Sequence, residues 1–214
     1  MLKLFKKDIL LAMHPVTPFF LLLSAMVLIP NYPYSVVFFY TGLSIFFTCL
    51  SGRENKDVFY SLTLPVQKKQ IVQARVAFAV CLQAIQLILV LVFGAVSQRI
   101  LPANAAGMEP NLAFFGWGLI IYAVFNAIFF GVYYRNVSRV GISFLASSAA
   151  VFLLVVMEIV ATYAIPFVRE VLDTKDPEHL GAKLGFLAVG LVIYLTSLFL
   201  TLRSTERNFE KQDI

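Results

Sequence analysis

Charged residues are scarce in this sequence. Of its 214 residues, 14% are charged and 60% are hydrophobic, and the mean hydropathy is +0.84. A soluble domain usually has roughly a quarter of its residues charged, so this chain cannot cover a water-exposed surface. We therefore expect lipid to surround most of it.

Histidine and cysteine are also scarce, with two of each. Cys49 and Cys81 lie within apolar stretches, which is typical of small packing residues and not of a disulfide or a metal site. His14 and His179 fall on opposite sides of the membrane in the topology derived below, so they cannot belong to one Ser/His/Asp triad. No glycine-rich loop ends in Gly-Lys-Ser or Gly-Lys-Thr, so the chain has no phosphate cradle of its own. We expect no catalytic residue, metal or cofactor in this chain, and an intramembrane enzyme is the weakest of the functions considered.

Apolar segments indicate about six membrane spans and no separate soluble domain, so we expect residues 1–214 to form one all-α, polytopic transmembrane domain. At helical rise the first span is only about 22 Å long, against roughly 30 Å of hydrocarbon. It must borrow part of the preceding helix, or the first two segments do not cross fully. The predicted spans are residues 15–29, 34–50, 72–96, 111–133, 141–168 and 184–202.

Residues 1–13 have the pattern of an amphipathic helix. Leu2, Phe5 and Ile9 recur at helical spacing, while three lysines and Asp8 occupy the other faces. Such a helix lies in the membrane interface with its lysines toward anionic headgroups. The alternative is that this segment is only the wet end of the first span.

The distribution of basic residues predicts the orientation. The N-terminal segment, the long loop 52–73 with its flank, the short loop 134–140 and the tail 203–214 hold 13 of the 17 Lys and Arg residues. Because basic loops stay in the cytoplasm, we expect both termini and the long loop to be cytoplasmic. The net charge of +5 then reflects membrane topology and does not indicate nucleic-acid binding.

Four of the polar residues inside the predicted spans are candidates for function, namely Glu158, Gln83, Gln86 and Asn126. Glu158 is the one carboxylate among them, and an intramembrane charge is by default a candidate functional group. The alternative is a glutamate that joins helices by hydrogen bonding to Gln83, Gln86 or Asn126. Gln83 and Gln86 are three residues apart and share a helix face, so they either line a translocation path or bond to neighbouring helices. We take these four residues as the candidate translocation path.

The loop 52–73 is more apolar than a solvated linker requires. Residues 53–62 are compatible with a helix, Leu64-Pro65 ends it, and residues 67–75 begin a second helix that runs into the next span. Phe59, Tyr60 and Leu62 lie close together among charges. A helix, a break and a helix of this kind favour a surface on which a partner protein docks.

A series of residues lies along this loop and its flank: Glu54, Leu62-Thr63-Leu64-Pro65-Val66, Lys68-Lys69-Gln70-Ile71-Val72 and Arg75. This pattern resembles the corresponding loop of the bacterial ABC-2 type transporter permeases, and the basic start, the charged tail, the chain length and the number of spans resemble them too. Gln67 departs from the Ser or Thr that is common there, and it is a poorer cap for the following helix.

The resemblance implies how such a chain works. Two permease subunits pair in the cell membrane, as a homodimer or a heterodimer, and each docks on a separate cytoplasmic ABC ATPase that binds ATP and Mg²⁺. The loop 52–73 is then a coupling helix that transmits the closure of the ATPase to the spans. The residues that the resemblance places at the ATPase interface are Glu54, Asp57, Phe59, Tyr60, Leu62, Leu64, Pro65, Lys68 and Lys69.

The resemblance thus favours the membrane subunit of an ATP-driven exporter, and the small size of the chain within this family implies amphipathic or antimicrobial peptides as the expected cargo. The alternative is an ion-coupled secondary transporter, or a non-transporting membrane assembly factor, that uses Glu158. A coupled transporter should have inverted repeats and broken helices at the midplane, and the sequence displays neither.

Overall fold

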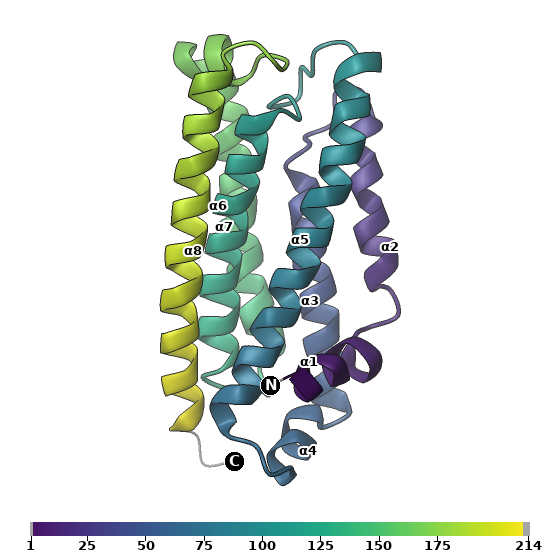
Figure 1. Cartoon of the computed structure of the whole chain (residues 1–214), viewed down its shortest axis with the longest axis vertical. Helices are drawn as coiled ribbons and strands as arrows, with labels where there is room; N and C mark the ends of the chain where they lie inside the picture. Colours follow the sequence, from purple (N-terminus) through teal and green to yellow (C-terminus); the bar gives the residue numbers. More distant parts are fainter. Residues whose placement is uncertain (1, 212–214) are drawn as a thin grey trace.

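The computed structural model describes residues 2–211, and within them every regular element is a helix (Figure 1). The predicted all-α fold is therefore confirmed. The elements are α1 (Leu2–Lys7), the π-helical turn η1 (Asp8–Ala12), α2 (Thr17–Leu22), the 3₁₀ helix η2 (Leu23–Leu28), α3 (Val36–Glu54), α4 (Asp57–Thr63), α5 (Lys68–Ile100), α6 (Leu112–Tyr133), α7 (Val140–Ala164), the π-helical turn η3 (Val168–Leu172) and α8 (Leu180–Glu210).

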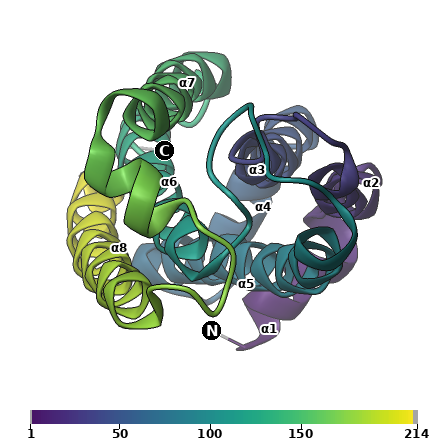
Figure 2. The same ribbon diagram turned by 90° about the horizontal axis from the view of Figure 1, so that it is seen from above.

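The long helices run side by side along the molecule. Seen from above, α6, α7 and α8 form one half of the bundle and α2, α3 and α5 the other (Figure 2). Five described helices are long and apolar enough to cross a membrane, and a bent pair at the amino end raises the number to six. This agrees with the predicted count of about six spans.

The structure bears on the two alternatives that the sequence leaves open for the first span. The interface helix, which we define as α1 with η1, is bent by 90° from the helix formed by α2 and η2. It lies across the end of the bundle (Figure 1), so it cannot lengthen the span that follows. Six of the span's residues take 3₁₀ geometry, which rises about 2.0 Å per residue against about 1.5 Å in an α-helix. This lengthens the span slightly, but it stays shorter than the roughly 30 Å of hydrocarbon. Pro18 in the first turn of α2 lacks the N–H that a continuing helix would need.

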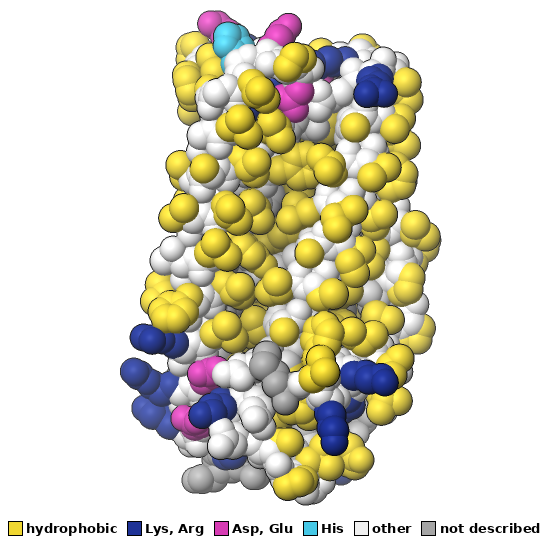
Figure 3. Space-filling view, in the orientation of Figure 1, with side chains coloured by type: hydrophobic (Ala, Val, Ile, Leu, Met, Phe, Trp, Pro, Cys, Tyr) yellow, Lys and Arg dark blue, Asp and Glu magenta, His cyan; other side chains and the backbone are white. Residues whose placement is uncertain are grey.

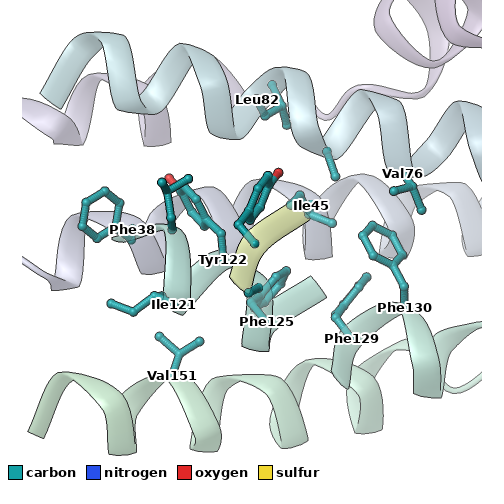
Figure 4. Packing of buried hydrophobic residues seen from close by; sticks show 14 of the residues in the cluster. Phe38, Ile45, Val76, Leu82, Ile121, Tyr122, Phe125, Phe129, Phe130 and Val151 are labelled. Atoms are coloured by element: carbon teal, nitrogen blue, oxygen red, sulfur yellow. The ribbon is translucent and has the colours of Figure 1, made fainter. Parts of the chain in front are cut away.

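Aromatic side chains of α6 fill the centre of the bundle. The rings of Phe125, Phe129 and Phe130 lie between α3 and α5 on one side and α7 on the other (Figure 4). Where α6 meets α8, the contact is made by Gly116 of α6 and Gly190 of α8. No larger side chain fits at Gly190, because its Cβ would overlap the carbonyl of Gly116. Small residues at such a crossing let two membrane helices approach closely, so α6 and α8 form the tightest helix pair.

The ends of two helices bear on the predictions for the loop and the tail. α5 is one continuous helix from Lys68 to Ile100, which confirms that the helix after Pro65 runs into the next span. Gln67 is the N-cap residue and forms a capping box with Gln70, in which the backbone N–H of Gln67 donates to Oε1 of Gln70 at 3.2 Å. α8 continues to Glu210, and Phe209 is buried with its ring centroid 5.2 Å from that of Tyr134. The predicted tail 203–214 is therefore mostly a packed helix end, and residues 212–214 lie outside the described part.

Basic side chains gather at one end of the molecule (Figure 3). This is the end where α1, α4 and the carboxyl end of α8 lie (Figure 1). Gln73 near the start of α5 donates to Glu206 near the end of α8 at 2.7 Å, which ties the two helices together there. We call this the basic end, and the opposite end, with the loops after α5 and α7, the outer end.

Candidate coupling site

The short helix α4 projects from the basic end (Figure 1). A two-residue turn joins it to α3, and Lys56 in this turn has a positive φ of 54°, which is not helical. The helix expected over residues 53–62 is therefore divided, because residues 53–54 end α3 and α4 begins at Asp57. Val58 and Ser61 on α4 are buried, whereas Phe59 is 48% exposed and Tyr60 61% exposed. Two large aromatic side chains therefore face outward from the tip of the bundle, beyond the long apolar helices.

The predicted interface residues divide into three groups in the structure. Leu62, Leu64 and Lys68 are half-buried, and the two leucines pack against the core. Asp57 turns inward, and its side chain is 15% exposed, so it faces away from the exposed residues of the loop. The residues that are exposed are Glu54, Phe59, Tyr60, Pro65 and Lys69.

Asp57 belongs to a cluster of charges between α4, α5 and the interface helix. Nη2 of Arg75 lies 2.6 Å from Oδ2 of Asp57, and Nε of Arg75 lies 3.1 Å from Oδ2 of Asp8. Nζ of Lys7 lies 2.7 Å from Oδ1 of Asp57 and donates to Oγ of Ser61 at 2.8 Å. We call Lys7, Asp8, Asp57 and Arg75 the Arg75 cluster.

The Arg75 cluster is buried and balanced in charge. Its two cations face two carboxylates, and Arg75 is 4% exposed and Asp8 2% exposed. Buried charges are tolerated when they are paired, and removing one partner of a buried pair costs about 3–5 kcal/mol. The planar guanidinium can bond to both carboxylates at once, which an ammonium could not do with the same geometry.

Sequence reasoning placed Asp8 among the wet faces of the interface helix, and this was wrong. Leu4 and Asp8, one turn apart, face the protein and are both buried, while Leu2 and Leu11 are about four-fifths exposed. The spacing of Leu4 and Asp8 was the available signal. The interface helix therefore turns Leu2 and Leu11 outward, and Leu4 and Asp8 toward the protein.

In the membrane interior, the glutamines of α5 bond to neighbouring helices. Nε2 of Gln83 donates to Oδ1 of Asn126 at 2.8 Å, and Nδ2 of Asn126 donates back at 3.1 Å. The hydroxyl of Tyr194 donates to Oε1 of Gln83 at 2.7 Å, and Nε2 of Gln86 donates to the carbonyl of Val37 at 3.1 Å. This geometry favours the helix-joining alternative for the two glutamines and Asn126.

Glu158 lies apart from these three residues, near the outer end of α7. Its Oε2 accepts from Oγ of Ser35 at 2.9 Å, and its Oε1 accepts from the backbone N–H of Met108 at 2.5 Å. A Cβ on Gly107, which has a φ of +151°, would lie 3.1 Å from Oε1. The expected partners Gln83, Gln86 and Asn126 were wrong, because loop residues reach Glu158 instead.

Two loops close the outer end around a second group of polar side chains. The backbone N–H of Glu109 donates to Oδ1 of Asp173 at 2.7 Å, and the side chain of Asn111 donates to the carbonyl of Leu172 at 2.7 Å. The buried Lys183 lies 3.0 Å from Oδ1 of Asp176. Burial, together with the nearby carboxylates of Glu109 and Glu158, raises the pKa of Asp173 from 3.8 to about 7.

An apolar cavity of about 460 Å³ opens between α3 and α7 on the membrane-facing side. None of the four residues of the predicted translocation path lines it. Ser148 and Ala149, small residues within α7, are the sequence signal that could have found it, since they leave room beside a helix. The lining residues are Val36, Phe39, Leu145, Ser148, Ala149, Val151, Phe152 and Val155.

These features together define a polytopic helical membrane protein with a short helix projecting from its basic end. The chain matches the family model described as ABC-2 family transporter protein over residues 3–206, so it belongs to this family. No curated protein and no solved structure gives a match. Membership identifies a membrane subunit of the ABC-2 transporter family, and it implies association with an ABC ATPase partner.

Proposed function

We propose that the chain is the permease subunit of an exporter, driven by ATP that a separate cytoplasmic ATPase binds with Mg²⁺ and hydrolyses. The observation that carries this proposal is the exposed pair Phe59 and Tyr60 on α4. Aromatic side chains exposed beyond the membrane are typical of the anchors of protein interfaces. The interface with the ATPase then consists of Phe59 and Tyr60 at its centre, with Glu54, Pro65 and Lys69 around them.

The basic end is the cytoplasmic end in this proposal. Its basic side chains, seen in Figure 3, are those that the positive-inside rule retains in the cytoplasm. Both termini and α4 then face the cytoplasm of a bacterial cell, where an ATPase has access to ATP. The interface helix lies along the inner surface of the membrane, with Lys3 and Lys6 exposed toward anionic headgroups.

The cavity between α3 and α7 supports the rest of the proposal. Its walls are apolar apart from Ser148, so it suits the apolar side of an amphipathic molecule better than a sugar or an ion. We infer that this face turns toward a second permease subunit and that cargo passes between the two. Amphipathic peptides, including antimicrobial ones, are the proposed cargo.

The ion-coupled alternative depends on Glu158. Both carboxylate oxygens of Glu158 accept hydrogen bonds from within the protein, from Ser35 and Met108. An acceptor held in this way anchors the outer loop to α3 and α7. No further observation favours ion coupling or an assembly factor, so the exporter is the proposed function.

Co-expression with the ABC ATPase encoded nearest to this chain tests the proposal. The complex, reconstituted in proteoliposomes, is expected to move a fluorescent amphipathic peptide across the membrane only when ATP and Mg²⁺ are supplied on the ATPase side. A hydrolysis-deficient ATPase is the control. Transport of the peptide that follows an ion gradient and ignores ATP would contradict the proposal.

A further inference from the structure

The helix α4 has few covalent constraints on its orientation. It is joined to α3 by the turn at residues 55–56, and to α5 by residues 64–67, which have no regular secondary structure. Short connections of this kind keep the ends of α4 in place, yet they allow the helix to roll about its own axis. Non-covalent contacts must therefore fix the face that α4 presents.

The buried Val58 supplies an apolar contact of this kind, and Lys7 and Arg75 supply the polar ones. Asp57 and Ser61 lie one turn apart on α4 and so share a face, and Nζ of Lys7 reaches both, at 2.7 and 2.8 Å. Arg75 holds the second carboxylate oxygen of Asp57 at 2.6 Å. With this face held inward, Phe59, two residues after Asp57, must point outward.

The same arginine also holds the interface helix. Nε and Nη2 of Arg75 lie 3.1 and 3.2 Å from the two carboxylate oxygens of Asp8. Arg75 itself lies on α5, a continuous helix of 33 residues that extends to the outer end. The buried guanidinium of Arg75 thus connects three elements: α4, the interface helix and the long helix α5.

We propose that the Arg75 cluster is the joint that passes displacement of α4 to α5 and the interface helix, with Asp57 and Asp8 as its two arms. This inference rests on the proposed function, because it assumes that an ATPase moves α4. It assigns Asp57 to transmission inside the permease and not to contact with the ATPase. The three helices then move as one unit, and α5 carries the motion to the outer end.

The variants Asp57→Asn and Asp8→Asn each remove one of the two carboxylates that Arg75 contacts. Either one leaves Arg75 with the other carboxylate, so no buried cation is left alone. Arg53→Gln is the matched control, since it removes an exposed cation from the same loop, and Arg53 contacts Glu54 and Ser138, outside the cluster. Thermal unfolding of each purified variant in nanodiscs verifies that it is folded.

The readout is hydrogen exchange of residues 2–12 in nanodiscs, with and without the ATPase locked in its ATP-bound state. In the natural protein and in Arg53→Gln, binding of the ATPase to α4 is expected to slow exchange in the interface helix, because coupled sites bias one another. In Asp57→Asn and Asp8→Asn, this response is expected to fall at least about threefold, while ATPase affinity changes less than about threefold. Peptide transport per ATP hydrolysed is expected to fall in both.

Three results separate the alternatives. If Asp57→Asn weakens ATPase binding by about tenfold or more, Asp57 is an interface residue and the proposed role of the Arg75 cluster is refuted. If both variants keep the full exchange response and the full transport per ATP, the cluster only stabilises the fold, and the joint is again refuted. If the natural protein binds no ABC ATPase at all, the proposed function fails before the joint is tested.

Discussion

The guanidinium of Arg75 and the carboxylate of Asp57 lie 2.6 Å apart, although 18 residues separate them in the chain. This contact holds α4 against the first turns of α5, and so fixes the position of α4 relative to α5 on the two sides of Pro65. It also determines which residues of the loop face outward. Phe59 and Tyr60 are available to a partner because Asp57 and Ser61 on the same short helix are not.

We expect Phe59→Ala and Tyr60→Ala each to weaken ATPase binding about tenfold or more, because truncating an aromatic anchor costs about 1–4 kcal/mol of binding free energy. Both side chains are exposed in the free permease, so its melting temperature should stay unchanged. The control is Phe167→Ala, since Phe167 is 57% exposed but lies just after α7, at the outer end. Binding can be measured by titrating labelled ATPase onto nanodiscs.

Docking of the ATPase on α4 is contradicted if Phe167→Ala weakens binding as much as Phe59→Ala does. Equal affinity of all three variants and the natural protein would also contradict it.

Substitutions of Glu158 distinguish anchoring of the outer loop from ion coupling. Glu158→Gln keeps an acceptor for the N–H of Met108 and a donor for Oγ of Ser35 but cannot carry a charge, so we expect stability and transport close to those of the natural protein. Glu158→Ala leaves both partners unpaired and should lower the free energy of unfolding by about 1–3 kcal/mol. Transport assays and denaturant titrations of the two variants verify this. Abolished transport in a stably folded Glu158→Gln variant would instead support ion coupling.

Gly190 tests the close crossing of α6 and α8. A Cβ there would overlap the backbone of Gly116, whereas nothing lies within 4 Å of a Cβ added at Gly185 on the same helix. We expect Gly190→Ala to lower the free energy of unfolding by about 1–3 kcal/mol through overpacking. Gly185→Ala should leave it unchanged or raise it slightly, since alanine is the better helix former. Thermal unfolding in detergent measures both, and equal melting temperatures would show that the two helices can move apart freely.

Asp173 predicts a pH dependence of the outer end. Its pKa is raised from 3.8 to about 7 because burial disfavours the carboxylate, with Glu109 and Glu158 adding to the effect and Lys183 opposing it. The folded state therefore holds the proton more tightly than the unfolded state. The stabilisation is fully present below about pH 4 and is lost as the pH rises through about 7.

Hydrogen exchange of residues 101–111 and 165–179 should accordingly be slower near pH 5 than near pH 8, once corrected for the intrinsic exchange rate. Asp173→Asn, which keeps an acceptor for the N–H of Glu109, should remove most of this difference. A pH dependence that persists in Asp173→Asn would assign it to another group.

Local chemistry was sufficient to predict some elements of this fold. Pro65 ends one helix, Gln67 begins the next, and the long apolar runs give the spans, because each of these features depends on neighbours a few residues away. The exposure of Phe59 and Tyr60 followed from the same local pattern.

Contacts between distant residues were not predictable in this way. Ser35 and Glu158 are 123 residues apart, and Lys7 and Asp57 are 50 apart. A single sequence contains no signal for such pairs beyond the expectation that a buried charge finds a partner. Asp8 was therefore assigned to a polar face of its helix, Asp57 was assigned to the ATPase interface without its partners Lys7 and Arg75, and Glu158 was assigned the wrong partners.

The central claim is that a separate ATPase docks on α4 at the basic end. Two tyrosines allow a matched test, since Tyr60 on α4 is 61% exposed and Tyr163 near the outer end of α7 is 63% exposed. A photoreactive phenylalanine analogue can replace either one in cells that also produce the ATPase. The account predicts a crosslink to the ATPase from position 60 and none from position 163. A crosslink from position 163, or none from position 60 in a complex that still co-purifies, would contradict it.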